Sequence, residues 1–153
     1  MSESPFLYMK KNSKTVLWND SADPKELKDA LTWGIVGATC NPVIALTALK
    51  ADSEHWVSRI KDYAKSHPIA TEDEIGWAMV KELSVNAAKL FEPEFEKQNG
   101  RNGRLSIQTD PRNFRNAKAL TDQAVEFSQL AKNMIVKIPV TSEAIAAFEE
   151  ATY

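Results

Sequence analysis

Short apolar runs alternate along this chain with longer segments of helical period. The apolar runs predict four β-strands, because each is short and is stopped by polar or turn residues; they cover residues 15–18, 35–39, 104–108 and 134–138. Each run is followed by at least one segment in which apolar side chains recur every three or four residues. Strands that alternate with helices are typical of an α/β protein with a parallel sheet.

The predicted helices begin at residues that commonly cap a helix. These residues are Asp23, Asn41, Thr71, and Thr141 or Ser142; two further helices are expected, one following Asp52-Ser53 and one from about Asn116. The segment after Thr71 is the most regular, since apolar residues recur every four positions from Ile75 to Phe91. Two further inner faces are expected, formed by Trp56, Ile60, Tyr63 and Ala64 in one helix and by Ile145 and Phe148 in the last.

Composition excludes several classes of function. The formal net charge of -2 gives no basic surface for nucleic acid. One cysteine in 153 residues cannot build a disulfide framework, which favours a reducing cytoplasm. We expect no signal peptide and no membrane span, because the first residues are polar and no apolar run is long enough. We assign no metal, since His55 and His67 lack metal-ligand spacing.

A polar residue stands at the end of each predicted strand. These residues are Asp20, Asn41, Gln108 and Lys137. In a parallel α/β barrel the carboxyl ends of the strands form the mouth of the active site, so the four side chains are expected to converge there.

Lys137 is the most informative of the four, because it interrupts an apolar strand. Alternation along the strand predicts that Met134, Val136 and Ile138 face the helices while Ile135 and Lys137 face inward. Desolvation disfavours the ammonium form of lysine, and a neutral amine is a nucleophile toward carbonyl carbon. The alternative is a lysine that reaches out of the strand end into solvent.

The other candidates also have structural interpretations. Asp20 could pair with Lys137 or move a proton, or it could be a solvated turn carboxylate. Asn41 could bind a substrate hydroxyl or simply cap a helix before Pro42. Gln108 could position a water or be a plain polar strand end. Cys40 is interpreted as a small packing residue.

Four segments carry a family resemblance, and their order and spacing agree with it. Residues 37–42, Gly-Ala-Thr-Cys-Asn-Pro, resemble the transaldolase segment Ala-Thr-Thr-Asn-Pro, and residues 103–110 are similar to its Gly-Arg-Ile/Val-Ser-x-Glu-x-Asp. Residues 134–141 look like the strand that holds the Schiff-base lysine. Residues 19–23 resemble the family's Ala-Asp-Thr-Gly-Asp.

The resemblance implies class I aldol chemistry on sugar phosphates, without metal or cofactor, in the pentose phosphate pathway. Lys137 would form the imine with a ketose phosphate, Asp20 would act as general acid and base, and Asn41 would bind the dihydroxyacetone part. Thr39, in the same segment as Asn41, would also bind substrate. A transaldolase then passes the three-carbon unit to an aldose phosphate.

The same resemblance implies a fold of which this chain holds only part. Residues 15–153 would be the N-terminal half of a (β/α)8 TIM barrel, with extra helices between strands two and three, and residues 1–14 an N-terminal extension. The family's phosphate-binding residues lie in strands five to eight. We therefore expect a fragment that is inactive alone, and its two open sheet edges predict self-association or pairing with the missing half.

Gln108 departs from the transaldolase pattern, where a glutamate helps water move protons. An amide can hold a water but cannot readily take its proton. Fructose-6-phosphate aldolases carry glutamine at the matching place, and their lysine strand, Val-Val-Lys-Val-Pro-Val-Thr, is nearer to this one. Simple aldol cleavage is therefore the second hypothesis, and a non-catalytic half-barrel interaction module is the third.

Overall fold

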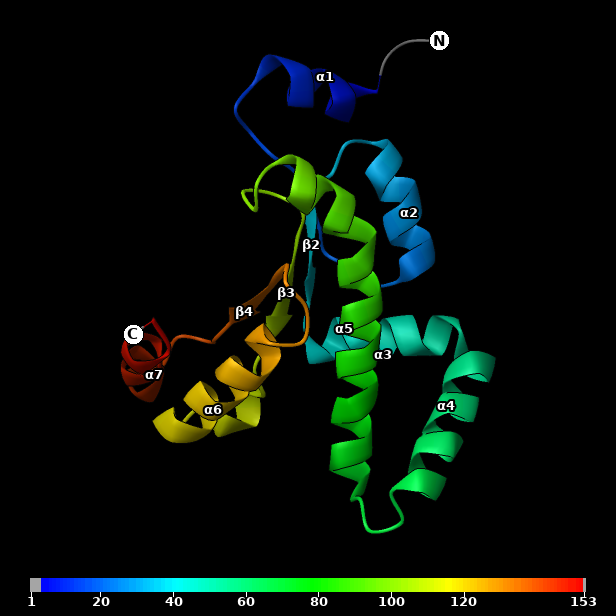
Figure 1. Cartoon of the computed structure of the whole chain (residues 1–153), viewed down its shortest axis with the longest axis vertical. Helices are drawn as coiled ribbons and strands as arrows, with labels where there is room; N and C mark the ends of the chain where they lie inside the picture. The colour runs from blue at the N-terminus through cyan, green and yellow to red at the C-terminus, as the bar shows by residue number, and fades with distance from the viewer. Residues whose placement is uncertain (1–3, 153) are drawn as a thin grey trace.

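The computed structural model of the protein describes residues 4–152 (Figure 1). In chain order the elements are α1 (Pro5–Asn12), β1 (Trp18–Asn19), α2 (Pro24–Thr32), β2 (Gly37–Cys40), α3 (Pro42–Ala51), α4 (Ser53–Ser66), α5 (Glu72–Lys97), β3 (Arg104–Gln108), the 3-10 turn η1 (Pro111–Asn113), α6 (Ala117–Ser128), β4 (Met134–Lys137) and α7 (Ser142–Thr152).

The four strands form one parallel sheet in the order β1-β2-β3-β4. Helices join each strand to the next, with α3, α4 and α5 all lying between β2 and β3. This is the arrangement of half of a (β/α)8 barrel, so the predicted fold class is confirmed. The strand bounds differ by a few residues from those predicted, most of all at β1, which is only two residues long.

One face of the sheet packs against helices. Successive side chains alternate between the two faces of a strand, and the helix-facing set includes Ala38, Leu105 and Met134, which are buried in the main core with Leu83 and Phe91 of α5. A smaller cluster joins Ile138 to α6 and α7. The opposite face carries the other half of the strand residues and is open.

The longest helix, α5, is the one whose sequence period was most regular. It begins with the predicted capping box: Glu74 N donates to Thr71 Oγ1 at 3.3 Å, and Thr71 N donates to the Glu74 carboxylate at 2.7 Å. Leu83 and Phe91 from its predicted apolar stripe are fully buried. The helix ends in a turn where Asn99, Gly100 and Gly103 all have positive φ.

Two helical features lie at opposite ends of the strands. The α4–α5 pair extends past α3, which starts at the carboxyl end of β2 (Figure 1). At the amino end lies α1, whose Leu7 and Lys10 approach Gly34. Helix α1 was not predicted from the sequence, because its apolar residues are consecutive and show no helical period.

Two predicted inner faces are partly wrong. In α4 the predicted residue Trp56 is buried and Tyr63 and Ala64 are half-buried, but Ile60 is exposed. In α7 both Ile145 and Phe148 are exposed, whereas its alanines at positions 144 and 147 are buried in the smaller cluster. Small side chains allow α7 to lie close to α6, so the bulky residues are turned away from that contact.

Candidate active site

The five residues singled out from the sequence stand on the open side of the sheet or at its carboxyl edge. In the strand register Thr39 is opposite Ser106, and Ser106 is opposite Ile135. Gln108 and Lys137 face each other two positions further toward the carboxyl ends. Partners in register point to the same face, and so do residues two apart on a strand, so these side chains form two successive rows.

Asp20 and Thr39 are joined directly. The Asn19–Ala38 register brings the end of β1 beside β2, and the Thr39 hydroxyl donates a short hydrogen bond to Asp20 Oδ1. An Asp20–Lys137 pair, one of the alternatives open for Asp20, does not occur among the described residues; the Asp20 carboxylate is bonded to Thr39. A carboxylate with one fixed oxygen retains acceptor capacity for a substrate hydroxyl.

Asn41 caps α3, as its local sequence predicted. Its Oδ1 accepts from Val43 N at 2.9 Å and from Ile44 N at 3.0 Å. These bonds fix the orientation of the carboxamide, and the two Nδ2 hydrogens remain as donors for a ligand oxygen. The capping role is established, and it leaves the predicted substrate role chemically open.

Gln108 and Lys137 end adjacent strands, and Thr109 N donates to the Lys137 carbonyl at 3.0 Å just beyond them. The predicted alternation holds, because Met134 and Ile138 are buried on the helix side while Lys137 lies on the open side. Of the two alternatives for Lys137, the structure of this chain shows the one that reaches into solvent, since Lys137 is exposed. No further strand covers the open face within residues 4–152, which explains that exposure.

Cys40 points away from this site and into the core. It is buried among the residues that join the sheet to α5, which confirms its interpretation as a packing residue. Burial raises the pKa of the thiol above its ordinary value. Within residues 4–152 no group of three or more His, Cys, Asp or Glu side chains is arranged to hold a metal ion, and no helix there is long and apolar enough to span a bilayer.

Two features near the site were not predicted. Ser106 occupies the row between Thr39 and Ile135, and strand alternation from Gln108 could have found it. Asp110 was assigned no role from the sequence, yet its buried carboxylate accepts a bifurcated hydrogen bond from Arg112 Nε, with 2.9 Å to each oxygen. The bond from Arg112 holds the pKa of Asp110 below its ordinary value.

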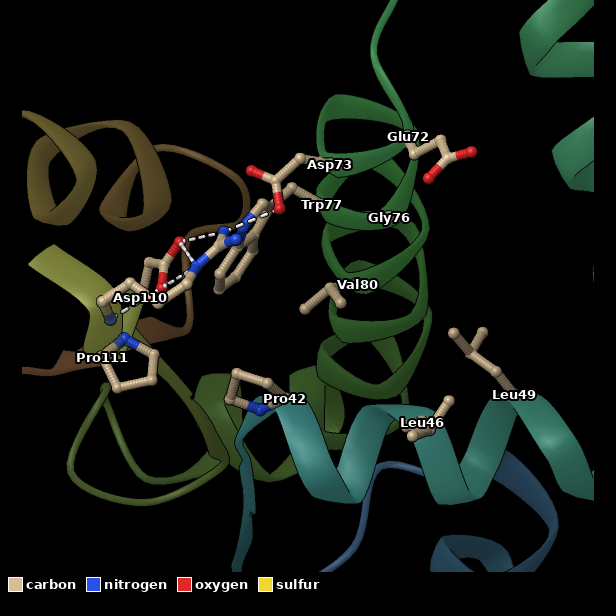
Figure 2. A pocket seen from close by; sticks show the side chains of 11 residues that line it. Pro42, Leu46, Leu49, Glu72, Asp73, Gly76, Trp77, Val80, Asp110 and Pro111 are labelled. Carbon is tan, nitrogen blue, oxygen red and sulfur yellow. Dashed lines mark hydrogen bonds and ion pairs between the residues drawn. The ribbon is translucent and has the colours of Figure 1, made fainter.

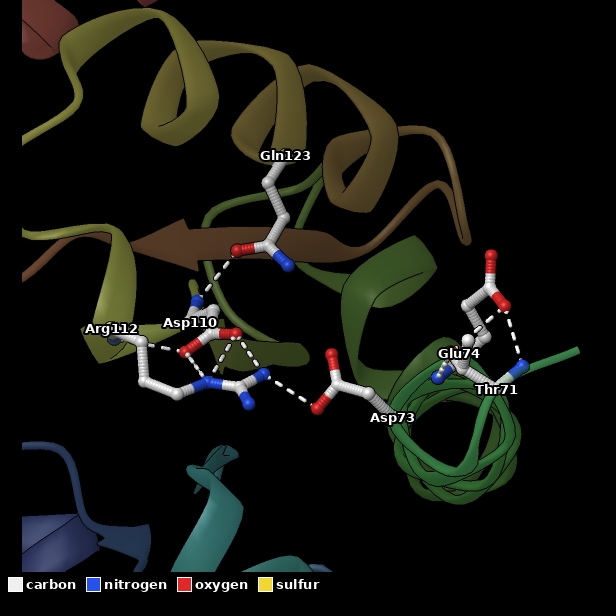
Figure 3. A network of polar contacts seen from close by, with 6 residues as sticks. All are labelled: Thr71, Asp73, Glu74, Asp110, Arg112 and Gln123. Carbon is white, nitrogen blue, oxygen red and sulfur yellow. Dashed lines mark hydrogen bonds and ion pairs between the residues drawn. The ribbon is translucent and has the colours of Figure 1, made fainter.

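Figure 3 shows how this network ties the loop after β3 to two helices. Arg112 Nη2 donates to Asp73 in the first turn of α5 at 2.7 Å. Asp110 N donates to Gln123 Oε1 of α6 at 2.6 Å. The loop that follows Gln108 is therefore held from both sides.

An apolar groove of about 430 Å³ lies between α3, α5 and this loop. Figure 2 shows Leu46 and Leu49 of α3 opposite Val80 and Trp77 of α5. None of the five predicted site residues lines it, so the groove is separate from the candidate active site.

The chain matches one family model, described as transaldolase/fructose-6-phosphate aldolase, over residues 17–153. It is also similar to curated proteins. It is 30% identical over 118 residues to transaldolase 2 of Streptomyces avermitilis, covering 76% of this chain and 31% of that protein. It is 32% identical over 116 residues to a transaldolase of Kocuria rhizophila, covering 74% and 31%.

A transaldolase of Mycobacterium marinum is 30% identical over 129 residues, which cover 83% of this chain and 33% of that protein. The chain thus spans about a third of the length of these relatives. Their names agree with the family resemblance found in the sequence.

Proposed function

The chain belongs to the transaldolase/fructose-6-phosphate aldolase family, and from that premise we propose that it supplies the imine-forming part of a transaldolase barrel. Lys137 is the nucleophile, Asp20 the general acid and base, and Asn41 and Thr39 the groups nearest the bound ketose phosphate. Strands five to eight, from polypeptide beyond these 153 residues, complete the barrel and bind the phosphate.

One observation supports this proposal: Lys137 and Gln108 are register partners, and Asp20 and Asn41 directly follow the other two strands. Lys137 and Gln108 are direct neighbours, and the Asp20–Thr39 pair lies on the other two strands. A site that forms an imine and then breaks a carbon–carbon bond needs a nucleophilic amine and a separate proton carrier. The arrangement supplies both.

The reaction follows from these groups. The Lys137 amine adds to the ketose carbonyl carbon, and the carbonyl oxygen leaves as water to give a protonated imine. Asp20 takes the proton from the hydroxyl beyond the breaking bond, so that oxygen forms the carbonyl of the departing aldehyde. The carbon–carbon bonding pair moves into the imine and gives an enamine.

In the transfer reaction the enamine then attacks the aldehyde carbon of an aldose phosphate. Asp20 returns its proton to the new hydroxyl, and water hydrolyses the imine to free Lys137. Covering Lys137 with the remaining strands would remove its ammonium from solvent, which favours the neutral amine that the first step requires.

Borohydride reduction in the presence of fructose 6-phosphate tests the role of Lys137. We expect a covalent adduct, measured by intact mass, when this chain is combined with a polypeptide that carries strands five to eight, and little or none on the chain alone. Lys137→Met should abolish the adduct. The matched control is Lys132→Met, because Lys132 is an exposed lysine paired with Glu96 outside the site. An adduct that survives Lys137→Met would refute the assignment.

Gln108 favours a second candidate function, simple aldol cleavage. Its amide can hold a water beside Lys137 but cannot readily take a proton from it. Product analysis with and without an aldose phosphate acceptor separates the two functions, since an aldolase releases free dihydroxyacetone and a transaldolase requires the acceptor. Gln108→Glu should increase the rate of imine formation, measured as the rate at which the reducible adduct appears.

A further inference from the structure

Trp18 of β1 occupies the space that the missing side chain of Gly37 leaves free. The two residues are direct partners in the β1–β2 register, so both face the open side of the sheet. A Cβ built on Gly37 would lie 2.7 Å from the Trp18 indole, closer than real contacts allow. Gly37 is buried although it is on the open side, because the indole covers it.

The Trp18–Gly37 contact lies one row toward the amino end of the strands from the Asp20–Thr39 pair. Asp20 follows Trp18 by two residues and Thr39 follows Gly37 by two residues, so the pair forms the next row on the same face. Two residues along a strand span roughly 7 Å, about the reach of an indole ring lying across two strands. Trp18 itself is 36% exposed.

We propose that Trp18 is a positioning residue for Asp20: its indole, seated on Gly37, forms the floor beneath the Asp20–Thr39 pair. This inference rests on the proposed function, in which Asp20 moves the proton. A rigid aromatic ring has few rotamers to lose and excludes water from the amino-end side of the carboxylate. The carboxylate is then held between the floor below and the Thr39 hydroxyl beside it.

Such a role has a defined consequence for catalysis. Proton transfer depends on the position of the carboxylate, and small displacements of a catalytic group slow the chemical step far more than they weaken binding. Loss of the floor should therefore lower kcat on the order of tenfold while KM changes little. Imine formation at Lys137 should persist, because Lys137 stands on β4, two strands from the Trp18–Gly37 contact.

The first experiment uses the 153-residue chain and does not depend on activity. Carbon-13 NMR follows the Asp20 carboxyl and Thr39 Cβ resonances in Trp18→Leu, Trp18→Phe and Gly37→Ala. We expect both resonances to move in Trp18→Leu and Gly37→Ala and to move less in Trp18→Phe, which keeps a flat ring. The matched control is Trp33→Leu, since Trp33 is an exposed tryptophan at the end of α2 that stacks on Phe6.

The second experiment measures kcat, KM and the borohydride adduct in the completed barrel. If the unsubstituted protein gives no adduct, the proposed function fails. If it gives the adduct and Trp18→Leu retains both the adduct and full kcat, only the role of Trp18 is refuted. Unchanged Asp20 and Thr39 resonances in Trp18→Leu would also overturn it. Should Trp18→Leu not fold, Gly37→Ala and Trp18→Phe decide by the same criteria, and parent-like resonances in both refute the proposal.

Discussion

Replacing Arg112 with methionine should destabilise the chain more than removing its exposed partner Asp73. Arg112 contacts two carboxylates that differ in burial: the side chain of Asp110 is 8% exposed and that of Asp73 is 58% exposed. Methionine keeps the aliphatic length but removes the guanidinium, which leaves the Asp110 carboxylate with only backbone and indole donors. The contact of Arg112 with Asp110 should therefore contribute more to the free energy of unfolding than its contact with Asp73.

The magnitude follows from that difference. A hydrogen bond to a charged group contributes about 1.5–3 kcal/mol. Because the buried Asp110 carboxylate keeps its backbone and indole donors, Arg112→Met should lower the free energy of unfolding by about 1.5 kcal/mol, the lower end of that range. An exposed ion pair contributes roughly 0.2–1 kcal/mol, so Asp73→Asn should cost less than about 1 kcal/mol. Urea unfolding followed by circular dichroism gives both values, with an unchanged m-value as evidence that only stability changed.

The pH dependence of stability provides an independent check on the Arg112–Asp110 pair. Arg112 holds the pKa of Asp110 below its ordinary value. The stabilisation is therefore fully present above the unfolded-state pKa of about 3.9 and is lost as the pH falls through the lower folded-state pKa. The stability gap between the parent and Arg112→Met should therefore stay constant from pH 7 to about pH 4 and shrink at lower pH. Equal costs for Arg112→Met and Asp73→Asn, or a gap that does not shrink in acid, would refute this reasoning.

Three further outcomes are expected. Gly103→Ala should lower the free energy of unfolding by about 2–5 kcal/mol, because φ is positive there and the new Cβ would lie 2.1 Å from Phe95 N. Gly76→Ala should instead raise the free energy of unfolding by about 0.4–1 kcal/mol, because nothing lies within 4 Å of its Cβ in α5. Asn133→Ala should lower the free energy of unfolding by about 1–3 kcal/mol, since the buried amide donates to Ala88 O and Gly103 O, both at 2.8 Å. The same urea titration measures this change, and an unchanged free energy would contradict the role of these two hydrogen bonds. The Cys40 thiol, whose pKa burial raises, should react slowly with a disulfide reagent at neutral pH and quickly in urea, and fast labelling of the folded chain would argue against that burial.

The element order of this protein could be predicted from its sequence because the signals are local. A cap and an apolar period act over three or four residues, and Thr71 with Glu74 or the stripe ending at Phe91 needs no knowledge of the rest of the chain. Where the local signal was absent, as in α1, or where small residues made the contact, as with Ala144 and Ala147, the prediction was incomplete or wrong.

The same difference between local and long-range information applies to the candidate site. Alternation in the last strand put Lys137 on the open face, and the polar residue at each strand end could be found by inspection. The residues' partners could not be found, because each lies on another strand. The Thr39–Asp20 bond joins positions 19 apart, and Arg112–Asp73 joins positions 39 apart.

By itself the sequence determined four strand–helix units, their caps, the face on which Lys137 lies and the family to which the chain belongs. Only the tertiary structure decided that Asp20 bonds to Thr39, that Trp18 lies on Gly37, and that Lys137 is exposed. The physical reason is register: hydrogen bonding between strands sets which distant residues become neighbours, and neither period nor propensity encodes that choice residue by residue.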